Sequence, residues 1–239
     1  MSEQETIDSF VQKWRSRWPE WQVAEVFVPR AQREVALAWA SLVQELTDAA
    51  WGGSDARPGE AKLGWWMEEL QGWARGIRRH PLGLVLQKLA APWTELAASL
   101  VALRNSRERP IDADDADAQL RPFAIAMAAV EVKLFGDPAD AAGEGSEVVT
   151  MCLLHMRLAH HPGESAPLQA LAAAGDNAAI VTWTRQLAGR GSLQGATRTR
   201  RLWAGLALDR LRRGEPVQPV SAARALWVSW RAARPVARL

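Results

Sequence analysis

The sequence contains a cluster of aspartates, Asp112–Asp117 (DADDAD). Several carboxylate oxygens close together can bind Mg²⁺, because this hard cation prefers oxygen ligands. The cluster also stands directly before an apolar run that reaches Leu134, where aspartates would cap a helix and face the positive end of its dipole. The sequence favours the capping role over a magnesium site.

Cys152 and His155 lie three residues apart, a spacing that places both side chains on one face of a helix. Such a pair could bind a metal ion or act as a Cys–His nucleophile, but either site needs further partners that the sequence does not display. We therefore predict a buried thiol beside a core histidine. Cys152 is also the only cysteine, which excludes an intramolecular disulfide and a cysteine-cluster metal site.

Helical periodicity continues along the whole chain, and alternating β-branched strands between turn signals are missing. We predict an all-α fold. A single domain over residues 1–239 is expected, because we find neither a long linker nor a repeat of about 30 to 50 residues. The predicted helices cover about residues 3–18, 22–28, 31–50, 60–77, 82–90, 92–107, the apolar run up to 134, 146–158, 166–174, 177–188, 194–213 and 221–233.

The segment Glu60–Ile77 (EAKLGWWMEELQGWARGI) contains two adjacent tryptophans on an apolar stripe. Spacings of three and four residues place the stripe on one side of a helix. Trp65 and Trp66 point about 100° apart, so one ring either widens the buried face or lines a groove. Both interpretations remain open. The stripe consists of Leu63, Trp66, Leu70, Trp73 and Ile77.

The composition, with 48% hydrophobic and 23% charged residues, is typical of a globular protein with a substantial core. No run of about 18 uncharged apolar residues occurs, and Met1–Trp14 is too acidic and polar for a secretory signal. We therefore expect a cytoplasmic protein. The 13 Trp, beside no Tyr, supply large rigid units that suit both cores and interfaces.

Positive charge is concentrated near the C-terminus. Residues 185–239 hold 12 Arg against two acidic residues, a net charge of +10 that leaves −8 for residues 1–184 of a chain with +2 overall. An Arg-rich helical tail could lie against the acidic body, or it could form a surface for anionic lipid or diphosphate. Nucleic acid is not expected, because no binding motif occurs. The predicted basic surface comprises Arg198, Arg200, Arg201, Arg210, Arg212 and Arg213.

About half of the chain resembles the squalene/phytoene synthase family. The resemblance rests on 25–46 (EVFVPRAQREVALAWASLVQEL), 59–70 (GEAKLGWWMEEL) and 78–84 (RRHPLGL), which occur in the family's order. It implies a helical isoprenoid-synthase bundle in which two aspartate-rich motifs hold magnesium ions. These ions neutralise the diphosphate leaving group, so that the prenyl carbocation can form.

The motifs that the resemblance implies are degenerate in this chain. The first would fall at Thr47, Asp48 and Trp51, where only Asp48 is acidic, and the second, near residues 147–158, contains no aspartate. Met67 stands where the family often has Arg. Asp48, Glu45 and Glu69 are the candidates for any remaining catalysis, together with the aspartate cluster. Mg²⁺ is therefore expected only if the protein is an active prenyltransferase. Otherwise we expect neither a metal ion nor a cofactor.

Three functions remain open at this point. The first is an accessory, assembly or isoprenoid-binding factor without condensation activity, since the family includes a respiratory complex I assembly factor that the GEAKLGWW run resembles. It would bind a prenyl chain, a prenyl diphosphate or a partner protein. The second is an active prenyltransferase, and the third is a scaffold at the inner membrane surface, docked through its basic C-terminal region. The predicted ligand groove comprises Trp39, Trp51, Trp65, Trp66 and Met67.

Overall fold

The computed structural model describes residues 3–136 and 142–234, and these ranges contain helices and no β-strand. The predicted all-α fold is confirmed. Two short 3₁₀ turns, η1 (Glu25–Phe27) and η2 (Arg30–Gln32), precede α3. The α-helices are α1 (Glu3–Arg17), α2 (Trp21–Ala24), α3 (Arg33–Trp51), α4 (Arg57–Ala74), α5 (Gly83–Leu86), α6 (Trp93–Asn105), α7 (Ala113–Phe135), α8 (Ala142–His160), α9 (Pro162–Ser165), α10 (Leu168–Ala174), α11 (Asp176–Arg190), α12 (Arg198–Arg212) and α13 (Ala222–Ala233).

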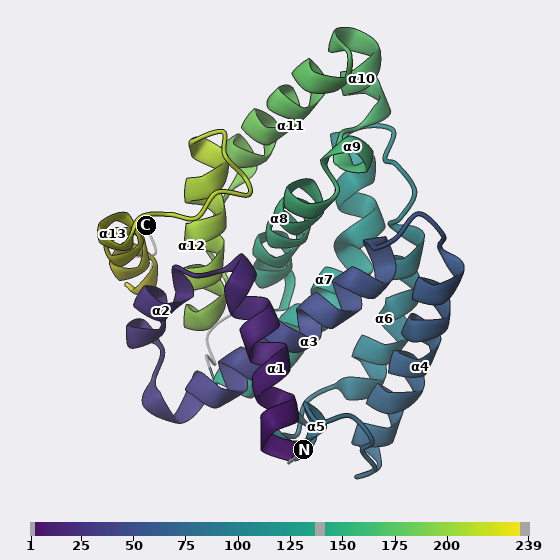
Figure 1. The fold of residues 1–239 in the computed structure, drawn as a ribbon, viewed down its shortest axis with the longest axis vertical. Helices are drawn as coiled ribbons and strands as arrows, with labels where there is room; N and C mark the ends of the chain where they lie inside the picture. The colour runs from purple at the N-terminus through teal and green to yellow at the C-terminus, as the bar shows by residue number, and fades with distance from the viewer. Residues whose placement is uncertain (1–2, 137–141, 235–239) are drawn as a thin grey trace.

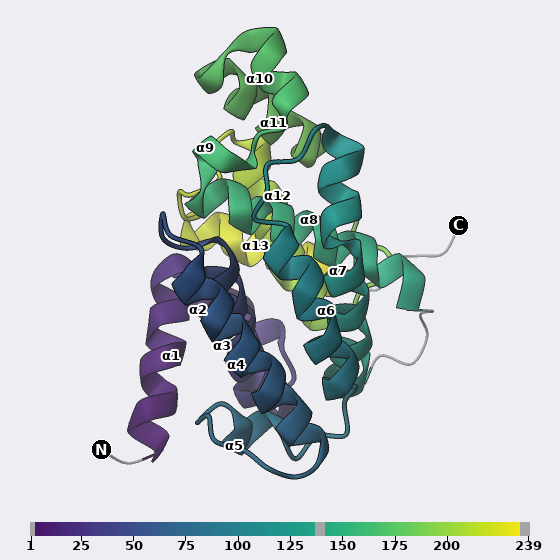
Figure 2. The same ribbon diagram turned by 90° about the vertical axis from the view of Figure 1, so that its right-hand side faces the viewer.

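Helix α3 runs through the middle of the molecule, between α1 on one side and α7 on the other (Figures 1 and 2). Helices α4 and α6 pack together beside it, while α8 and α12 pack together on its other side, toward α11 (Figure 1). Helices α10 and α11 extend to one end of the molecule, and α13 lies at its outer edge against α12 and α2. The buried apolar side chains of these helices form one continuous cluster.

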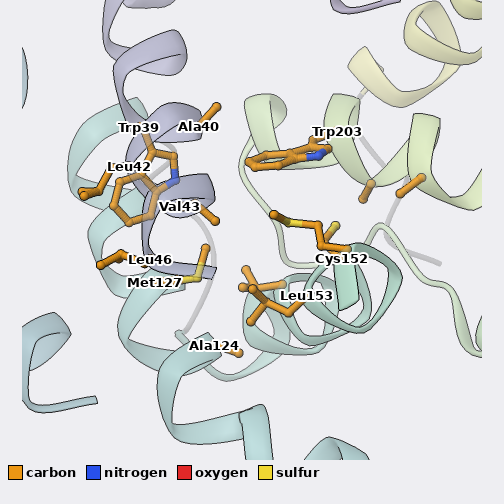
Figure 3. Packing of buried hydrophobic residues seen from close by; sticks show 14 of the residues in the cluster. Trp39, Ala40, Leu42, Val43, Leu46, Ala124, Met127, Cys152, Leu153 and Trp203 are labelled. Atoms are coloured by element: carbon orange, nitrogen blue, oxygen red, sulfur yellow. The ribbon is translucent and has the colours of Figure 1, made fainter. Parts of the chain in front are cut away.

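The four central helices α3, α7, α8 and α12 enclose the apolar interior. Figure 3 shows Trp39 and Leu46 of α3 and Met127 of α7 on one side of this interior, and Cys152 of α8 and Trp203 of α12 on the other. All five side chains are buried, with relative exposures of 0% to 2%. No helix within the described ranges is long and apolar enough to cross a membrane.

Helix α4 confirms four positions of the predicted stripe and corrects the fifth. Leu63, Trp66, Leu70 and Trp73 are buried, whereas Ile77 is 58% exposed. The helix ends at Ala74, because Gly76 takes a φ of 80° and the Ile77 N–H binds the carbonyl of Gly72 at 2.9 Å. This closing turn ends the helix three residues before Ile77, so Ile77 does not continue the buried stripe.

The tryptophan doublet divides between the core and the surface. Trp66 is 1% exposed, whereas Trp65 is half-buried. We predict that Trp66→Ala lowers the free energy of unfolding by about 3–5 kcal/mol, because it leaves a cavity in a packed core. Trp65→Ala, the matched control, should cost less than half as much. Urea denaturation of both variants measures the difference, and equal losses would contradict the assignment of Trp66 alone to the core.

Candidate functional site

Glu45 and Asp48 lie three residues apart on α3, where the family resemblance expects metal-binding carboxylates, and both face basic side chains. Lys13 Nζ of α1 lies 2.6 Å from Glu45 Oε1 and 2.9 Å from Asp48 Oδ2. Lys62 Nζ of α4 lies 2.7 Å from Glu45 Oε2, and Arg17 Nη1 of α1 lies 2.7 Å from Asp48 Oδ1. We call these five residues the Glu45–Asp48 cluster.

The cations of this cluster keep its carboxylates ionised. Burial raises the pKa of Glu45, but hydrogen bonds from Lys13 and Lys62 outweigh it and hold the pKa below its usual value. Burial has the same effect on Asp48, and hydrogen bonds from Arg17 and Lys13 again lower its pKa. With three cations and two carboxylates, the cluster carries a net charge of +1.

His80 lies at the edge of this cluster as a neutral ring. It packs against Phe10, Trp65 and Trp66, with ring centroids 4.8, 5.9 and 4.5 Å away. The Leu82 N–H donates to its Nδ1 at 3.2 Å. Burial lowers the pKa of His80 from 6.5 to about 4, although the negative charges of Glu45 and Glu69 oppose this shift.

The third candidate carboxylate, Glu69, organises the backbone after α4. Its Oε1 accepts hydrogen bonds from Trp73 Nε1 at 2.9 Å and from the backbone N–H groups of Arg79 and His80, both at 2.7 Å. Arg79 Nε donates to Oε2 at 3.1 Å. These bonds hold the segment that carries His80, so Glu69 positions the edge of the site. None of them joins Glu69 to Glu45 or Asp48.

The aspartate cluster caps α7, as predicted. Asp112 accepts hydrogen bonds from the N–H groups of Asp114 and Asp115. Asp114 and Asp117 pair with Arg190 of α11. The partners of Glu45 and Asp48 lie on α1 and α4 instead. Among the described residues, no three His, Cys, Asp or Glu side chains are grouped so that they could hold a metal ion.

A buried ion pair crosses the centre of the bundle. Glu131 of α7 accepts bonds from Arg200 of α12, with Arg200 Nε 3.1 Å from Glu131 Oε2, and from Trp39 Nε1 at 2.8 Å. Arg200 also hydrogen-bonds Cys152 and is 2% exposed. Burial opposes its charge, but Glu131 and Cys152 raise its pKa. Charge and bulky side chains therefore fill the region between the four central helices.

Cys152 and His155 are both buried, as predicted, and they do not form a nucleophilic pair. Burial raises the pKa of the Cys152 thiol, whose partner is Arg200. His155 Nε2 lies 3.0 Å from the Pro216 carbonyl oxygen, and burial lowers the pKa of this ring to about 3. Each side chain thus serves a separate structural contact.

The predicted groove residues do not line one common surface. Trp39, Trp51 and Trp66 are 1% to 3% exposed, and the Trp51 indole donates to Ser106 Oγ at 3.1 Å. Trp65 and Met67 are half-buried on α4. A pocket of about 490 Å³ lies elsewhere, between α7, α8 and α11, and another of about 520 Å³ lies between α1, α3 and α5. None of the five predicted residues lines either pocket.

The predicted basic surface is wrong for Arg200 and Arg210, which are 2% and 3% exposed. Arg210 pairs with the buried Glu20 at 2.7 Å. Arg201 and Arg213 are half-buried, and Arg213 contacts Asp209 and Glu215. Only Arg198 and Arg212 of the six are exposed. Because α12 packs on several sides, its arginines serve mainly as internal partners.

The sequence interpretation missed the cations of the site. Lys13, Arg17 and Lys62 lie on other helices than Glu45 and Asp48, so helical spacing does not reveal them. One signal was available: this Arg-rich chain has only four lysines, and two of them bind Glu45. Glu131 was missed as well, since it follows an apolar run and carries no motif.

Comparison with known structures shows that the all-α fold resembles the isoprenoid synthase fold. Among solved structures, the chain is similar to a dehydrosqualene synthase crystallised in complex with a ligand. The TM-score is 0.68 and the sequence identity 13%, and the match covers 96% of each chain. No family model and no curated protein sequence matches the chain. The likeness therefore concerns the fold.

Magnesium ions, which this fold class implies, do not fit the Glu45–Asp48 cluster. Its four carboxylate oxygens already contact ammonium or guanidinium nitrogens at 2.6 to 3.2 Å. Helix α8 approaches Asp48 with His160, whose pKa burial lowers to about 4 despite the attraction of Asp48. A magnesium ion needs near-octahedral oxygen ligands, and a set of two engaged carboxylates and a histidine does not supply them.

We predict that Glu131 and Arg200 stabilise the fold only when both are present. Arg200→Met should lower the free energy of unfolding by about 3–5 kcal/mol, because it leaves a buried carboxylate without its cation. Glu131→Gln combined with Arg200→Met should recover most of this loss, since Gln still accepts the Trp39 hydrogen bond. Denaturant unfolding of the single and double variants forms the cycle. Additive losses would show that the two side chains do not stabilise each other.

Acid should destabilise the protein from about pH 6.5 downward. The pKa of His80 is lowered to about 4 in the fold, so the unfolded chain binds a proton first and stability is lost as pH falls from about 6.5 to 4. The lowered pKa values of Glu45 and Asp48 act in the same direction at lower pH. His80→Asn should reduce the slope by at most about 1.4 kcal/mol per pH unit, the limit for one proton. Thermal unfolding between pH 4 and 8 measures it, and an unchanged slope would contradict a buried neutral His80.

Proposed function

We propose that this protein is a squalene/phytoene synthase-like protein without prenyl condensation activity, which acts as an accessory or isoprenoid-binding factor. The observation that carries the proposal is the Glu45–Asp48 cluster. Its carboxylates contact Lys13, Arg17 and Lys62, whereas diphosphate ionisation in this fold class depends on carboxylate-bound magnesium. In this chain, lysine and arginine side chains occupy the positions next to these carboxylates where magnesium ions would have to bind for condensation.

The interior of the bundle supports the same proposal. Condensation of two prenyl chains needs a long apolar cavity that excludes water. In this chain the region between the four central helices holds Trp39 and Trp203 (Figure 3). It also holds the Glu131–Arg200 pair, and each of these four residues is at most 2% exposed. An isoprenoid would therefore bind at the edge of the bundle rather than through its centre. Trp65 and Met67 are the half-buried residues of the predicted groove, and Trp65 lies beside His80.

The cluster can still attract an anion without a metal. Lys13 and Lys62 each expose nearly half of their side chains, 45% and 44%, and the cluster has an excess of one positive charge. A diphosphate group could bind these ammonium groups from the solvent side, with its prenyl chain against Phe10 and Trp65. Such binding holds the diphosphate as an anion and provides no acid or metal to expel it as a leaving group.

The proposal predicts no release of pyrophosphate from farnesyl or geranylgeranyl diphosphate in the presence of Mg²⁺. An active dehydrosqualene synthase assayed in parallel is the positive control. Magnesium-dependent release that disappears in Asp48→Ala would contradict the proposal and establish a prenyltransferase with a rearranged metal site. In the same samples, farnesyl diphosphate should change the tryptophan fluorescence of the wild type and have a weaker effect on Lys13→Ala/Lys62→Ala. No response in the wild type would leave a partner protein as the ligand.

A further inference from the structure

Helix α13 has an unusual distribution of side-chain size. The face that packs against α12 and α2 carries Ala225, Val228, Ser229 and Ala232, which are small or medium in size and buried. The contact is close, because a Cβ on Gly205 of α12 would lie 3.2 Å from Ala232 Cβ and 3.3 Å from Val228 Cγ1. The small residues therefore seat the helix, and its large apolar residues point away from the core.

The outward face of α13 is apolar and basic. Leu226, Trp227 and Trp230 are 49%, 51% and 43% exposed. At about 100° per residue, these three side chains and those of Arg231 and Arg234 fall within one sector of roughly 140°. We call these five residues the α13 face. Figure 1 shows that α13 lies at the outer edge of the molecule, so this face is accessible to a large partner.

Both arginines of the face lie over its tryptophans. The Arg231 guanidinium carbon is 4.8 Å from the centroid of the Trp227 ring, and that of Arg234 is 3.6 Å from the Trp230 ring. The two guanidinium groups therefore contact aromatic rings, and their positive charge lies within the apolar face. Helix α13 itself contains no acidic residue. The acidic residues of the elements packed against α13 pair with arginines outside the α13 face: Glu20 with Arg210, Glu25 with Arg15, and Asp209 with Arg224 of α13.

We propose that the α13 face docks the protein on an anionic lipid bilayer. Tryptophan is favoured at the level of the lipid headgroups, where its ring is buried and its N–H remains hydrated. Arginine side chains beside it can reach the lipid phosphates while their stems stay in the apolar layer. The positive charge of the face is complementary to such a membrane, and its apolar residues supply the insertion. The inference is independent of whether the bundle binds an isoprenoid.

Sedimentation with vesicles tests the docking. Full-length protein should sediment with phosphatidylglycerol/phosphatidylcholine vesicles, and less with pure phosphatidylcholine or at high salt, because salt screens the exposed arginines. Arg231→Gln/Arg234→Gln should weaken the partition to anionic vesicles by about 30-fold, at roughly 1 kcal/mol for each arginine. Trp227→Ser/Trp230→Ser should weaken it at least as much. The matched control Arg121→Gln/Ile125→Ser, which changes an exposed basic and an exposed apolar residue of α7, should bind as the wild type does.

A second measurement fixes the orientation. Brominated phosphatidylglycerol should quench the fluorescence of the wild type more strongly than that of Trp227→Phe/Trp230→Phe, although both proteins sediment with the vesicles. Equal quenching would show that these two rings remain outside the bilayer and would overturn the proposal. The proposal also fails if the wild type does not bind anionic vesicles at low salt, or if the α7 control loses binding as strongly as the α13 variants.

Discussion

The architecture depends on compensating the carboxylates that the helices bury. A buried charge without a partner costs several kcal/mol, so each needs a cation close by. Glu131 has Arg200, Glu20 has Arg210, and Glu45 has Lys13 and Lys62. These pairs join α7 to α12, the start of α2 to the end of α12, and α3 to both α1 and α4. They therefore link helices from different parts of the sequence, while the apolar contacts supply most of the stabilisation.

Tryptophan makes this compensation possible inside an apolar core. Arg200 lies 4.5 Å from the Trp203 centroid, and Arg210 lies 4.2 Å from that of Trp18. Trp18 and Trp203 in turn meet edge to face at 5.8 Å. Each guanidinium thus has a carboxylate on one side and an aromatic face on another, which lowers the cost of burying it. Trp18 and Trp203 thus belong to the core together with the two arginines that they cover.

Helical periodicity predicted α4 because one face of that helix is buried, and the spacing reveals this face. The aspartate cluster predicted the cap of α7. Periodicity also predicted α3, although nearly all of its residues from Ala36 to Trp51 are buried. It failed for α12, where arginine was expected to mark the wet side. Every residue of α12 from Leu202 to Leu211 is buried, so Asp209 and Arg210 lie inside with the leucines. The partners of Glu45 were also beyond reach, since a contact between helices depends on packing and not on spacing within one chain segment. The ordered segments GEAKLGWWMEEL and RRHPLGL indicated the isoprenoid synthase fold, and the structural likeness bears out that fold alone.

The same constraint connects the pairing of Glu45 and Asp48 with the proposed absence of condensation activity. Metal-binding carboxylates on facing helices repel one another until an ion binds, and this repulsion is tolerated for the sake of chemistry. Here α1 supplies Lys13 and Arg17 as permanent counterions of Asp48, and the charge of Asp48 also acts on His160 of α8. The two carboxylates are consequently neutralised before any ligand arrives. An incoming diphosphate must share these cations with Glu45 and Asp48, so the site favours reversible binding of an anion over the ionisation of a carbon–oxygen bond.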